Sequence, residues 1–391
     1  MRLETLSHGE WRRLLRWLDT SGLALYFLDR ITELGLSAML APAVLARLQQ
    51  NLADNTERTN SMIAESLTIQ RQFQEAGLSY ILLKGFTLWP ESVSNLALRS
   101  QLDLDFLVAE SCASQARQIL EDNGYYLQAI SGRSWEFKST EGRTGSLKDL
   151  YKAGLTRSVE LHLELDTRTT SANHSVLTHG QVRHIHGLAT PVASSVDLFL
   201  GQGLHLYKHV CSEFVRAAHL IEFRRHILAR YNDQQFWNQL HERTSHDANA
   251  CLKLGTVILL ISRVMGSFAP AALTRWTVDP VPAAVRRWIE LYARRMALAG
   301  FPGGKLYLIL QAELEACGLP ARRSLRQALV PNRLPPAIAQ SVAGEDLAGR
   351  WMRYRRQLHF ILFRFRFHAV HGTQYLCESI RWRNYKNGLS H

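Results

Sequence analysis

The sequence is poor in cysteine and has no two cysteines close enough to form a thiolate motif. Only five occur among 391 residues, and none belongs to a CxxC pair: Cys112, Cys211, Cys251, Cys317 and Cys377. Such wide spacing suits a reducing compartment better than a disulfide framework. The sequence therefore predicts a cytoplasmic protein and argues against a zinc site built on thiolates.

Long apolar runs and several well-known motifs are missing as well. The most apolar stretch, Leu254 to Ser262, is far shorter than the ~20 residues that cross a bilayer, so we expect a buried helix and no membrane span. The first 19 residues are charged throughout and lack the apolar centre of a secretory signal. No GxSxG, P-loop or GxGxxG pattern occurs, which leaves serine hydrolases, P-loop NTPases and Rossmann enzymes without support.

Positive charge, by contrast, is abundant. The chain has 46 Lys and Arg against 34 Asp and Glu, a formal net charge of +12. This excess favours polyanionic or phosphate-bearing partners, or an anionic membrane surface, although a solvated basic surface explains it too. With 46% hydrophobic and 20% charged residues the composition is globular, and at this length we expect two or three packed units.

The apolar pattern divides the chain into three parts. Residues 1–77 show helical spacing and predict about three helices. Residues 78–190 contain alternating runs typical of β-strands, with one helix that Ser111 caps. Residues 191–391 return to helical spacing broken by prolines. We therefore predict the α+β class, a mixed sheet between helical ends, with strands at 78–83, 102–108, 125–130, 134–138 and 157–165.

Two aspartates stand two residues apart in the run LDLDFLV. Side chains at this spacing on a strand point to the same face, so Asp103 and Asp105 project together. The intervening apolar residues are expected in the core: Leu102, Leu104 and Phe106. Magnesium prefers oxygen ligands, and two such carboxylates can hold one or two ions against a triphosphate. A DxD pair alone is a weak signal, because chance pairs on solvated strands are common.

Three neighbouring features strengthen this signal. Lys84 and Gly85 follow a strand at an expected helix start, where backbone amides and the lysine can hold phosphate oxygens, although the pair also suits a plain turn. Glu160 lies on the last alternating run and can act as metal ligand or as base for an attacking hydroxyl, with Glu164 as the fallback. His162 alternates with these acids, and we favour a structural role over that of a partner to metal ligands.

These residues stand in the order of known motifs: Leu83-Lys84-Gly85, Arg99, the run from Leu102 to Val108, Glu160 to Leu163, and His205 to His209. With them the chain resembles a bacterial nucleotidyltransferase family of the DNA polymerase beta-like superfamily, more faintly over the helical prefix and as far as about residue 260. It departs from the family at Glu160, where Asp is more frequent, and at Leu163, where an aromatic residue is usual. Lys84-Gly85 replaces the Gly-Ser turn of the wider superfamily.

The resemblance implies a polymerase beta-like palm that transfers a nucleoside monophosphate from a triphosphate to a hydroxyl, with two Mg²⁺ ions or Mn²⁺ in their place. It assigns catalysis and metal binding to Asp103, Asp105 and Glu160. Contacts to the nucleotide and its phosphates fall to Lys84, Gly85, Arg99, Lys208 and His209.

The acceptor is left open by the sequence. The absence of an RNA-binding motif favours a small molecule, a peptide or a protein over RNA or tRNA. The alternative is a non-catalytic protein that binds nucleotides or nucleic acid on the same fold. Segment 351–367, rich in arginine and aromatic residues, suits either a stacking and phosphate-binding surface or an amphipathic core helix with snorkelling arginines.

Overall fold

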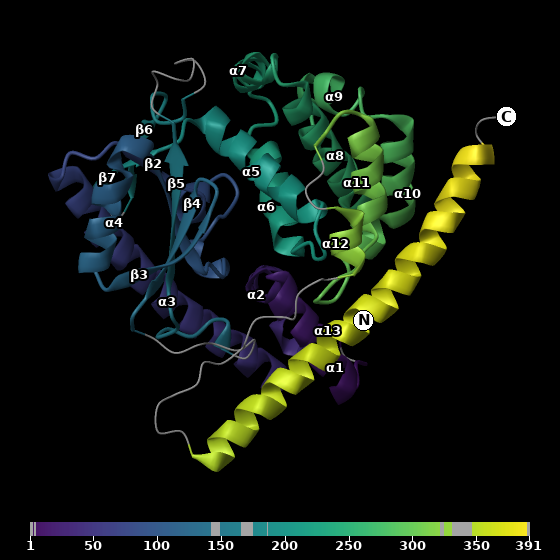
Figure 1. Cartoon of the computed structure of the whole chain (residues 1–391), viewed down its shortest axis with the longest axis horizontal. Coiled ribbons are helices and arrows are strands. Elements are labelled where there is room, and N and C mark those ends of the chain that lie inside the picture. Colours follow the sequence, from purple (N-terminus) through teal and green to yellow (C-terminus); the bar gives the residue numbers. More distant parts are fainter. Residues whose placement is uncertain are drawn as a thin grey trace. The chain divides into compact units, whose positions relative to one another are not determined.

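The computed structural model of the chain describes residues 3, 5–141, 149–165, 175–185, 187–320, 324–330 and 346–388 (Figure 1). It divides into two compact units. The first consists of Met1–Leu206 and Arg216–Pro280, and the second of Tyr207–Val215 and Val281–His391. The first unit contains both the predicted helical prefix and the predicted palm, and the three-part division by sequence stays a prediction.

The first unit begins with three helices, as the apolar spacing predicts: α1 (His8–Ser21), α2 (Ala24–Glu33) and α3 (Pro42–Glu75). Ser7 and Glu10 form a capping box at the start of α1, in which each side chain binds the other residue's backbone N–H. Gly22 ends α1 with a φ of 76°, a left-handed conformation that glycine adopts without strain. Helix α3 then extends over 34 residues toward the sheet.

A seven-stranded mixed sheet follows, in the order β3-β4-β5-β2-β1-β7-β6. Strand β2 pairs in parallel with β5 and antiparallel with β1. Strand β7 pairs in parallel with β1 through one residue pair, Leu82 with Val192. The strands are β1 (Tyr80–Leu83), β2 (Asp103–Ala109), β3 (Tyr125–Ser131), β4 (Ser134–Ser139), β5 (Ser158–Glu164), β6 (Gln181–Ile185) and β7 (Leu188–Val192).

One face of the sheet is buried under α3 and α4 (Ala113–Asp122). Alternate residues of β2 and β5 point into this core: Leu104, Phe106, Val108, Val159, Leu161 and Leu163. The ring of Phe106 meets that of Phe73 from α3 edge to face, with centroids 5.5 Å apart. The predicted α+β class is thereby confirmed, and the acids of β2 and β5 are left on the opposite face.

Three details of the sequence prediction are wrong. Leu102 does not enter the core but is 42% exposed, because β2 begins only at Asp103. Ser111 does not cap α4; a 3₁₀ turn precedes the helix, and Cys112 takes the cap position without a side-chain hydrogen bond. Strands β6 and β7 were not foreseen, because Pro191 in β7 argues against a strand in the sequence.

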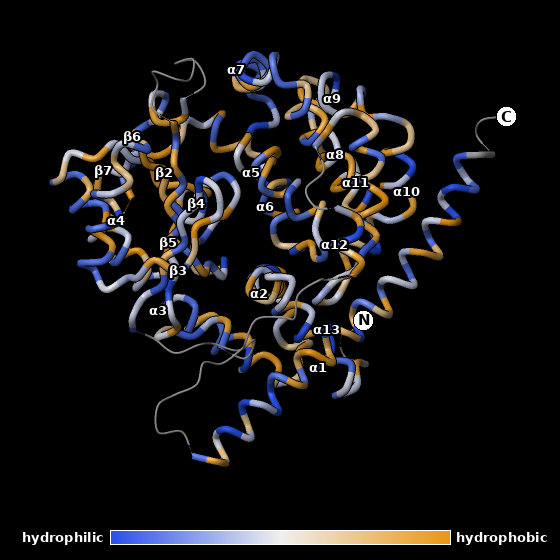
Figure 2. Tube along the Cα trace, in the orientation of Figure 1, coloured by the Kyte–Doolittle hydropathy of each residue, from blue (hydrophilic) through white to orange (hydrophobic). Residues whose placement is uncertain are grey.

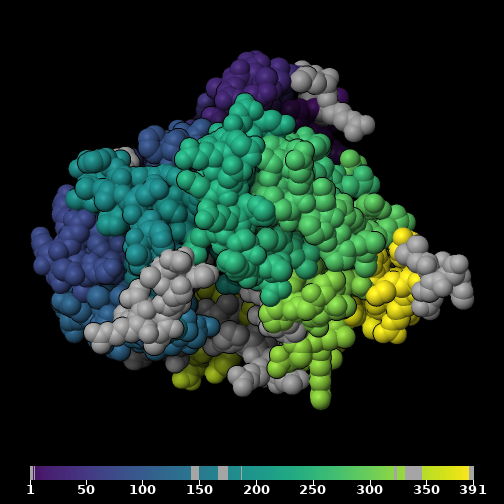
Figure 3. Space-filling model, turned by 90° about the horizontal axis from the view of Figure 1, so that it is seen from above, coloured from purple at the N-terminus to yellow at the C-terminus, as the bar shows by residue number. Residues whose placement is uncertain are grey.

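Further helices complete the first unit: α5 (Ser195–Val210, whose last residues belong to the second unit), α6 (Ala217–Ala229), α7 (Gln234–Thr244), α8 (Ala248–Met265) and α9 (Ala271–Thr277). They are seen from above, in teal and green, in Figure 3. Within the described ranges, α8 alone is long and apolar enough to cross a membrane. Its residues Leu254, Val257 and Ile258 are fully buried, as predicted for a core helix.

The second unit is helical: α10 (Ala283–Ala297), α11 (Tyr307–Ala316), α12 (Leu325–Leu329) and α13 (Leu347–Gly388). The end of α13 is fixed to α11, where Glu313 accepts hydrogen bonds from Trp382 Nε1 at 2.7 Å and Lys386 Nζ at 3.0 Å. Segment 351–367 lies in the first half of α13, where hydrophilic and hydrophobic residues alternate (Figure 2).

The core face yields a test of the strand register. We expect Leu104→Ala to reduce the free energy of unfolding of the first unit by about 2–5 kcal/mol, because it opens a cavity in the core. Leu102→Ala removes the same atoms from an exposed side chain and should change stability by less than about 0.5 kcal/mol. Chemical denaturation followed by circular dichroism measures both, and equal losses would contradict the register.

Candidate functional site

The acids of β2 and β5 are brought together by the pairing of these strands. In the parallel register Asp103 lies opposite Ser158, and Asp105 lies opposite Glu160. On the other side of β2, Leu83 at the end of β1 lies opposite Asp105. The two acids and the end of β1 therefore meet at one position, on the face of the sheet opposite α3 and α4.

Asp105 is the centre of this group and is only 3% exposed. Its Oδ1 atom lies 3.1 Å from Lys84 Nζ and 3.1 Å from His162 Nε2. The same imidazole nitrogen lies 3.4 Å from Glu160 Oε2. Ligand atoms of Asp105, Glu160 and His162 lie within 4.8 Å of one another, as in a metal site. We call these three residues with Lys84 the Asp105 group.

His162 contacts both Asp105 and Glu160, which its place in the sequence pattern did not indicate. Burial alone would lower the pKa of His162, but its contacts with Asp105 and Glu160 raise it. The hydrogen bond from His162 in turn lowers the pKa of Glu160. Burial would raise the pKa of Asp105, yet His162 and the Lys84 ammonium hold it below its ordinary value. The structure therefore keeps both carboxylates charged by enclosing them with cations.

Asp103 lies on the same face but does not join the three clustered ligand residues. Burial, and next the negative charge of Asp105, raise the pKa of Asp103. The positive charges of Arg99 and Lys84 act on it in the opposite direction. Arg58 from α3 and Arg216 just before α6 also interact electrostatically with Asp103. Asp103 is therefore a second acid of the site, set among basic side chains.

Arg99 is held in place by residues from several elements. Asn55 Nδ2 of α3 donates a 3.3 Å hydrogen bond to the Arg99 carbonyl, and Arg99 Nε lies 3.3 Å from Glu222 Oε2 of α6. Tyr26 of α2 donates to the other oxygen of Glu222 at 3.0 Å. Burial would lower the pKa of Arg99, but Glu222 raises it. Sequence reasoning missed Glu222, since it lies 123 residues from Arg99 in the chain and belongs to no local motif.

The Lys84-Gly85 turn is a tight junction. Lys84 has a φ of 47° and Gly85 a φ of 51°, and only a four-residue 3₁₀ helix follows, Gly85–Leu88. A Cβ atom at Gly85 would lie 2.3 Å from Gln101 Nε2, the atom that donates a 2.6 Å hydrogen bond to the Asp103 carbonyl. The helix start expected here is thus a single short 3₁₀ helix, and the glycine leaves room for Gln101 to support the start of β2.

Three predicted residues remain: the fallback acid Glu164 in the first unit, and Lys208 and His209 in the second. Glu164, the fallback acid, accepts hydrogen bonds from Ser175 Oγ and from the backbone of Val176 and Leu177, so it holds a turn instead. Lys208 and His209 stand at the end of α5 in the second unit. Their contact with a nucleotide stays a prediction.

Comparison with known families agrees with this arrangement. The family model described as "Uncharacterised nucleotidyltransferase" matches residues 7–266, which include the whole Asp105 group. The chain belongs to this family of uncharacterised nucleotidyltransferases. The resemblance to a nucleotidyltransferase family is thus confirmed. No curated protein matches the chain.

Two solved structures show a distant likeness to this chain. One is an antigenic nucleotidyltransferase-like protein from Paracoccidioides brasiliensis, with 12% identity over 56% of this chain and 98% of the other and a TM-score of 0.33. The other is the antibiotic-resistance factor ANT(2'')-Ia, with 9% identity over 48% of this chain and 99% of the other and a TM-score of 0.32. Scores this low carry no argument about activity.

A mostly apolar cavity of about 310 Å³ begins beside the Asp105 group, since Lys84 and His162 form part of its wall. We call it the α5 cavity because one face of α5 closes it. Much of its wall is aliphatic: Leu83, Leu88, Leu107, Val176, Leu198 and Leu206. The protein therefore offers an apolar space directly next to its buried acids.

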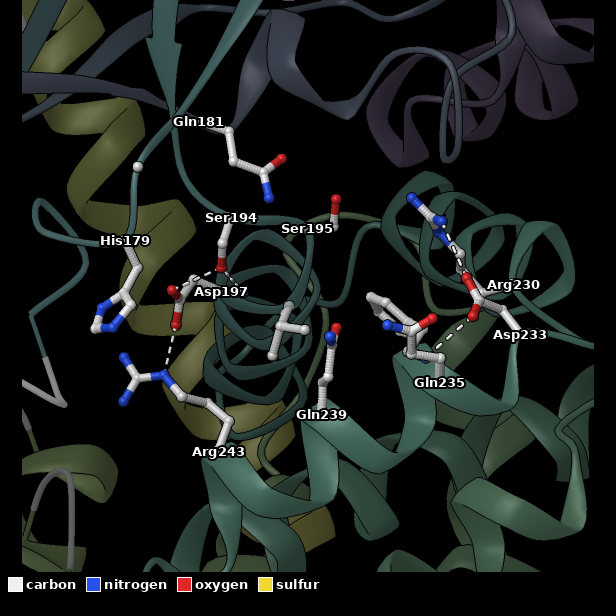
Figure 4. Close-up of a pocket in the computed structure, with 13 residues that line it drawn as sticks. His179, Gln181, Ser194, Ser195, Asp197, Arg230, Asp233, Gln235, Gln239 and Arg243 are labelled. Carbon is white, nitrogen blue, oxygen red and sulfur yellow. Dashed lines mark hydrogen bonds and ion pairs between the residues drawn. The ribbon is translucent and has the colours of Figure 1, made fainter.

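A larger, polar pocket of about 510 Å³ lies at the first turn of α5 (Figure 4). Asp197 of α5 forms an ion pair there with Arg243 at 2.8 Å, and Arg230 pairs with Asp233 at 3.2 Å. None of its lining residues, all within the described part of the chain, belongs to the Asp105 group. Although this pocket is larger than the α5 cavity, the Asp105 group remains the candidate catalytic site.

The Lys84-Gly85 turn can be tested with two glycines of similar backbone conformation. Gly132, in the β3–β4 turn, has a φ of 59° and no atom within 4 Å of an added Cβ. Both Gly85→Ala and Gly132→Ala should therefore lose about 1–2 kcal/mol of stability through left-handed strain. Gly85→Ala should lose about 1–3 kcal/mol more, because Gln101 must move. Thermal or chemical unfolding measures the difference, and identical losses would disprove the role of Gln101.

Proposed function

We propose that the protein is a magnesium-dependent nucleotidyltransferase that moves a nucleoside monophosphate from a triphosphate to a hydroxyl of a small molecule, a peptide or a protein. The main support is the register of β2 and β5, which sets Asp105 beside Glu160 with Asp103 on the same face. Membership of the family of uncharacterised nucleotidyltransferases supports the reaction type.

The residues of the site fit a divalent metal. Asp103, Asp105 and Glu160 offer carboxylate oxygens, the ligands that Mg²⁺ and Mn²⁺ prefer, whereas the imidazole of His162 suits softer ions better. We propose that the three acids hold two ions and that His162 orients Asp105 and Glu160. When bound, the metal stabilises the negative charge that develops on the phosphate oxygens.

The reaction moves few atoms. The acceptor oxygen attacks the α-phosphorus, the bond from that phosphorus to the pyrophosphate oxygen breaks, and the hydroxyl proton passes to Glu160. Glu160 is half-buried beside Asp105 and stands at the exposed side of the group, where an acceptor can approach. Lys84 and Arg99 supply positive charge for the triphosphate, and we propose that Gly85, Lys208 and His209 also contact the nucleotide.

Removal of one central acid tests this proposal. Asp105→Asn should reduce transfer at least a hundred-fold, since the amide is a poor metal ligand, while the melting temperature falls by only a few degrees. Glu164→Gln is the matched control: this acid is on the same face of β5 but binds the 175–177 turn, so transfer should stay within about two-fold. Label from α-³²P-labelled triphosphates, traced with and without cell extract, measures transfer.

The destination of the label separates the alternatives. Label on a small molecule, on a peptide or on the protein itself supports the proposal. Specific label on tRNA that Asp105→Asn abolishes would make RNA the acceptor. Calorimetry with ATP, GTP, CTP and UTP in magnesium covers the remaining case, because binding without any transfer would leave a non-catalytic nucleotide-binding protein.

A further inference from the structure

The α5 cavity has walls of two kinds. Its aliphatic part comes from the end of β1, from β2, from the residues after β7 and from α5; Leu88, Ala193 and Leu206 are at most 4% exposed. At the other part, Lys84 and His162 connect the cavity with Asp105. A molecule that reacts at the Asp105 group can therefore extend into an apolar space without leaving the site.

The charged side chains of the wall are held in ion pairs, and two of them, Lys84 and Asp197, pair with residues outside the wall. Arg99 pairs with Glu222 at 3.3 Å, and Asp197 pairs with Arg243 at 2.8 Å. Lys84 and Arg99 are the residues that we assign to the triphosphate. A charged group of the acceptor would then meet Glu222 and Asp197, which are already paired, and competition with those pairs in a poorly hydrated space is unfavourable. An aliphatic group displaces no ion pair, and its transfer from water into an apolar space is favourable.

A nucleobase is a poorer match for this space. Proteins bind bases by stacking them on aromatic or arginine planes and by hydrogen bonds to their edges. No Phe, Tyr or Trp occurs in the lining, every residue of which lies in the described ranges. Its planar side chains are already engaged: Arg99 with Glu222, His162 with Asp105, and His205 with His219 at a ring distance of 5.8 Å. The amide oxygen of Gln202 already accepts hydrogen bonds from Ser92 at 3.1 Å and His226 at 2.8 Å.

We propose that the α5 cavity binds an aliphatic group of the acceptor. The substrate is then a hydroxyl compound whose reacting oxygen is close to an aliphatic chain or side chain, such as a serine or threonine next to a leucine in a peptide. This inference rests on the proposed function, because the same Asp105 group activates the hydroxyl. It excludes acceptors that are polar on all sides next to the reacting oxygen.

Gly201 provides a way to fill the cavity. It lies on the face of α5 that lines the cavity, one helical turn from Asp197 and one from His205. A Cβ atom at Gly201 meets no heavy atom within 4 Å, whereas one at Gly203 would lie 2.4 Å from Leu254 Cδ2. Gly201→Leu therefore has room for its Cβ and adds an aliphatic side chain at the wall of the cavity, and leucine favours a helix more than glycine does.

The experiment compares the full-length protein with Gly201→Leu and with Gly372→Leu. Gly372 is also within a helix, α13, and its Cβ would likewise meet no atom within 4 Å, so it is the matched control. Saturation-transfer NMR measures the binding of 1-butanol and 1-hexanol, and calorimetry measures the binding of ATP with magnesium. Thermal unfolding checks that all three proteins are folded.

We expect hexanol to bind the unmodified protein and Gly372→Leu roughly 15-fold more tightly than butanol, from two more buried methylenes. Gly201→Leu should weaken hexanol binding at least ten-fold and leave ATP affinity within two-fold. Unchanged hexanol binding in Gly201→Leu would overturn the proposal. So would competition between hexanol and ATP, because the cavity would then hold the nucleoside.

The two proposals fail in different ways. If no variant binds ATP while hexanol binding still depends on position 201, the proposed function fails and the apolar site remains. If ATP binds and hexanol does not, the acceptor proposal fails and nucleotidyl transfer remains. Transfer of label to 1-hexanol in the unmodified protein, reduced in Gly201→Leu, would support both.

Discussion

The parallel pairing of β2 with β5 is the constraint on which the site depends. Its register forces Asp105 and Glu160 to be neighbours on a sheet whose other face is fully buried, so the acids cannot turn away. Like charges at this spacing repel strongly in a buried place. The presence of Lys84 and His162 against Asp105 follows from that repulsion, because two cations make the arrangement stable before any substrate arrives.

The wider site repeats this balance of charge. The acidic side is formed by Asp103, Asp105, Glu160 and Glu222, and the basic side by Arg58, Lys84, Arg99 and Arg216. These Asp and Glu side chains equal the Lys and Arg side chains in number, so a metal ion alone or a triphosphate alone would add a large charge of one sign in a poorly hydrated place. On the proposed function, metal and triphosphate together disturb the balance least, and this favours their entry as one complex.

Local pattern was sufficient to predict part of this architecture. The alternation in LDLDFLV and RSVELHLEL assigned the faces of β2 and β5, and with them Asp103, Asp105 and Glu160, since a two-residue period is a property of the strand itself. Glu222 and Arg216 could not be found in this way, because α6 approaches β2 only through tertiary packing. Strand β6 was not predicted because its side chains are mostly exposed and show no apolar alternation. Strand β7 was not predicted because it contains Pro191.

The pairing of β1 with β7 has a mechanical consequence. Strands β1 to β5 form a continuous hydrogen-bonded ladder through β2, whereas the β6–β7 hairpin is joined to it by the single pair of Leu82 and Val192. Few backbone hydrogen bonds must therefore open to release the hairpin, compared with the seven residue pairs that connect β2 and β5. The sheet is thus a plate of five strands that carries the acids, and its border of two strands is held mainly by side chains, such as Arg183 and the fully buried Val192.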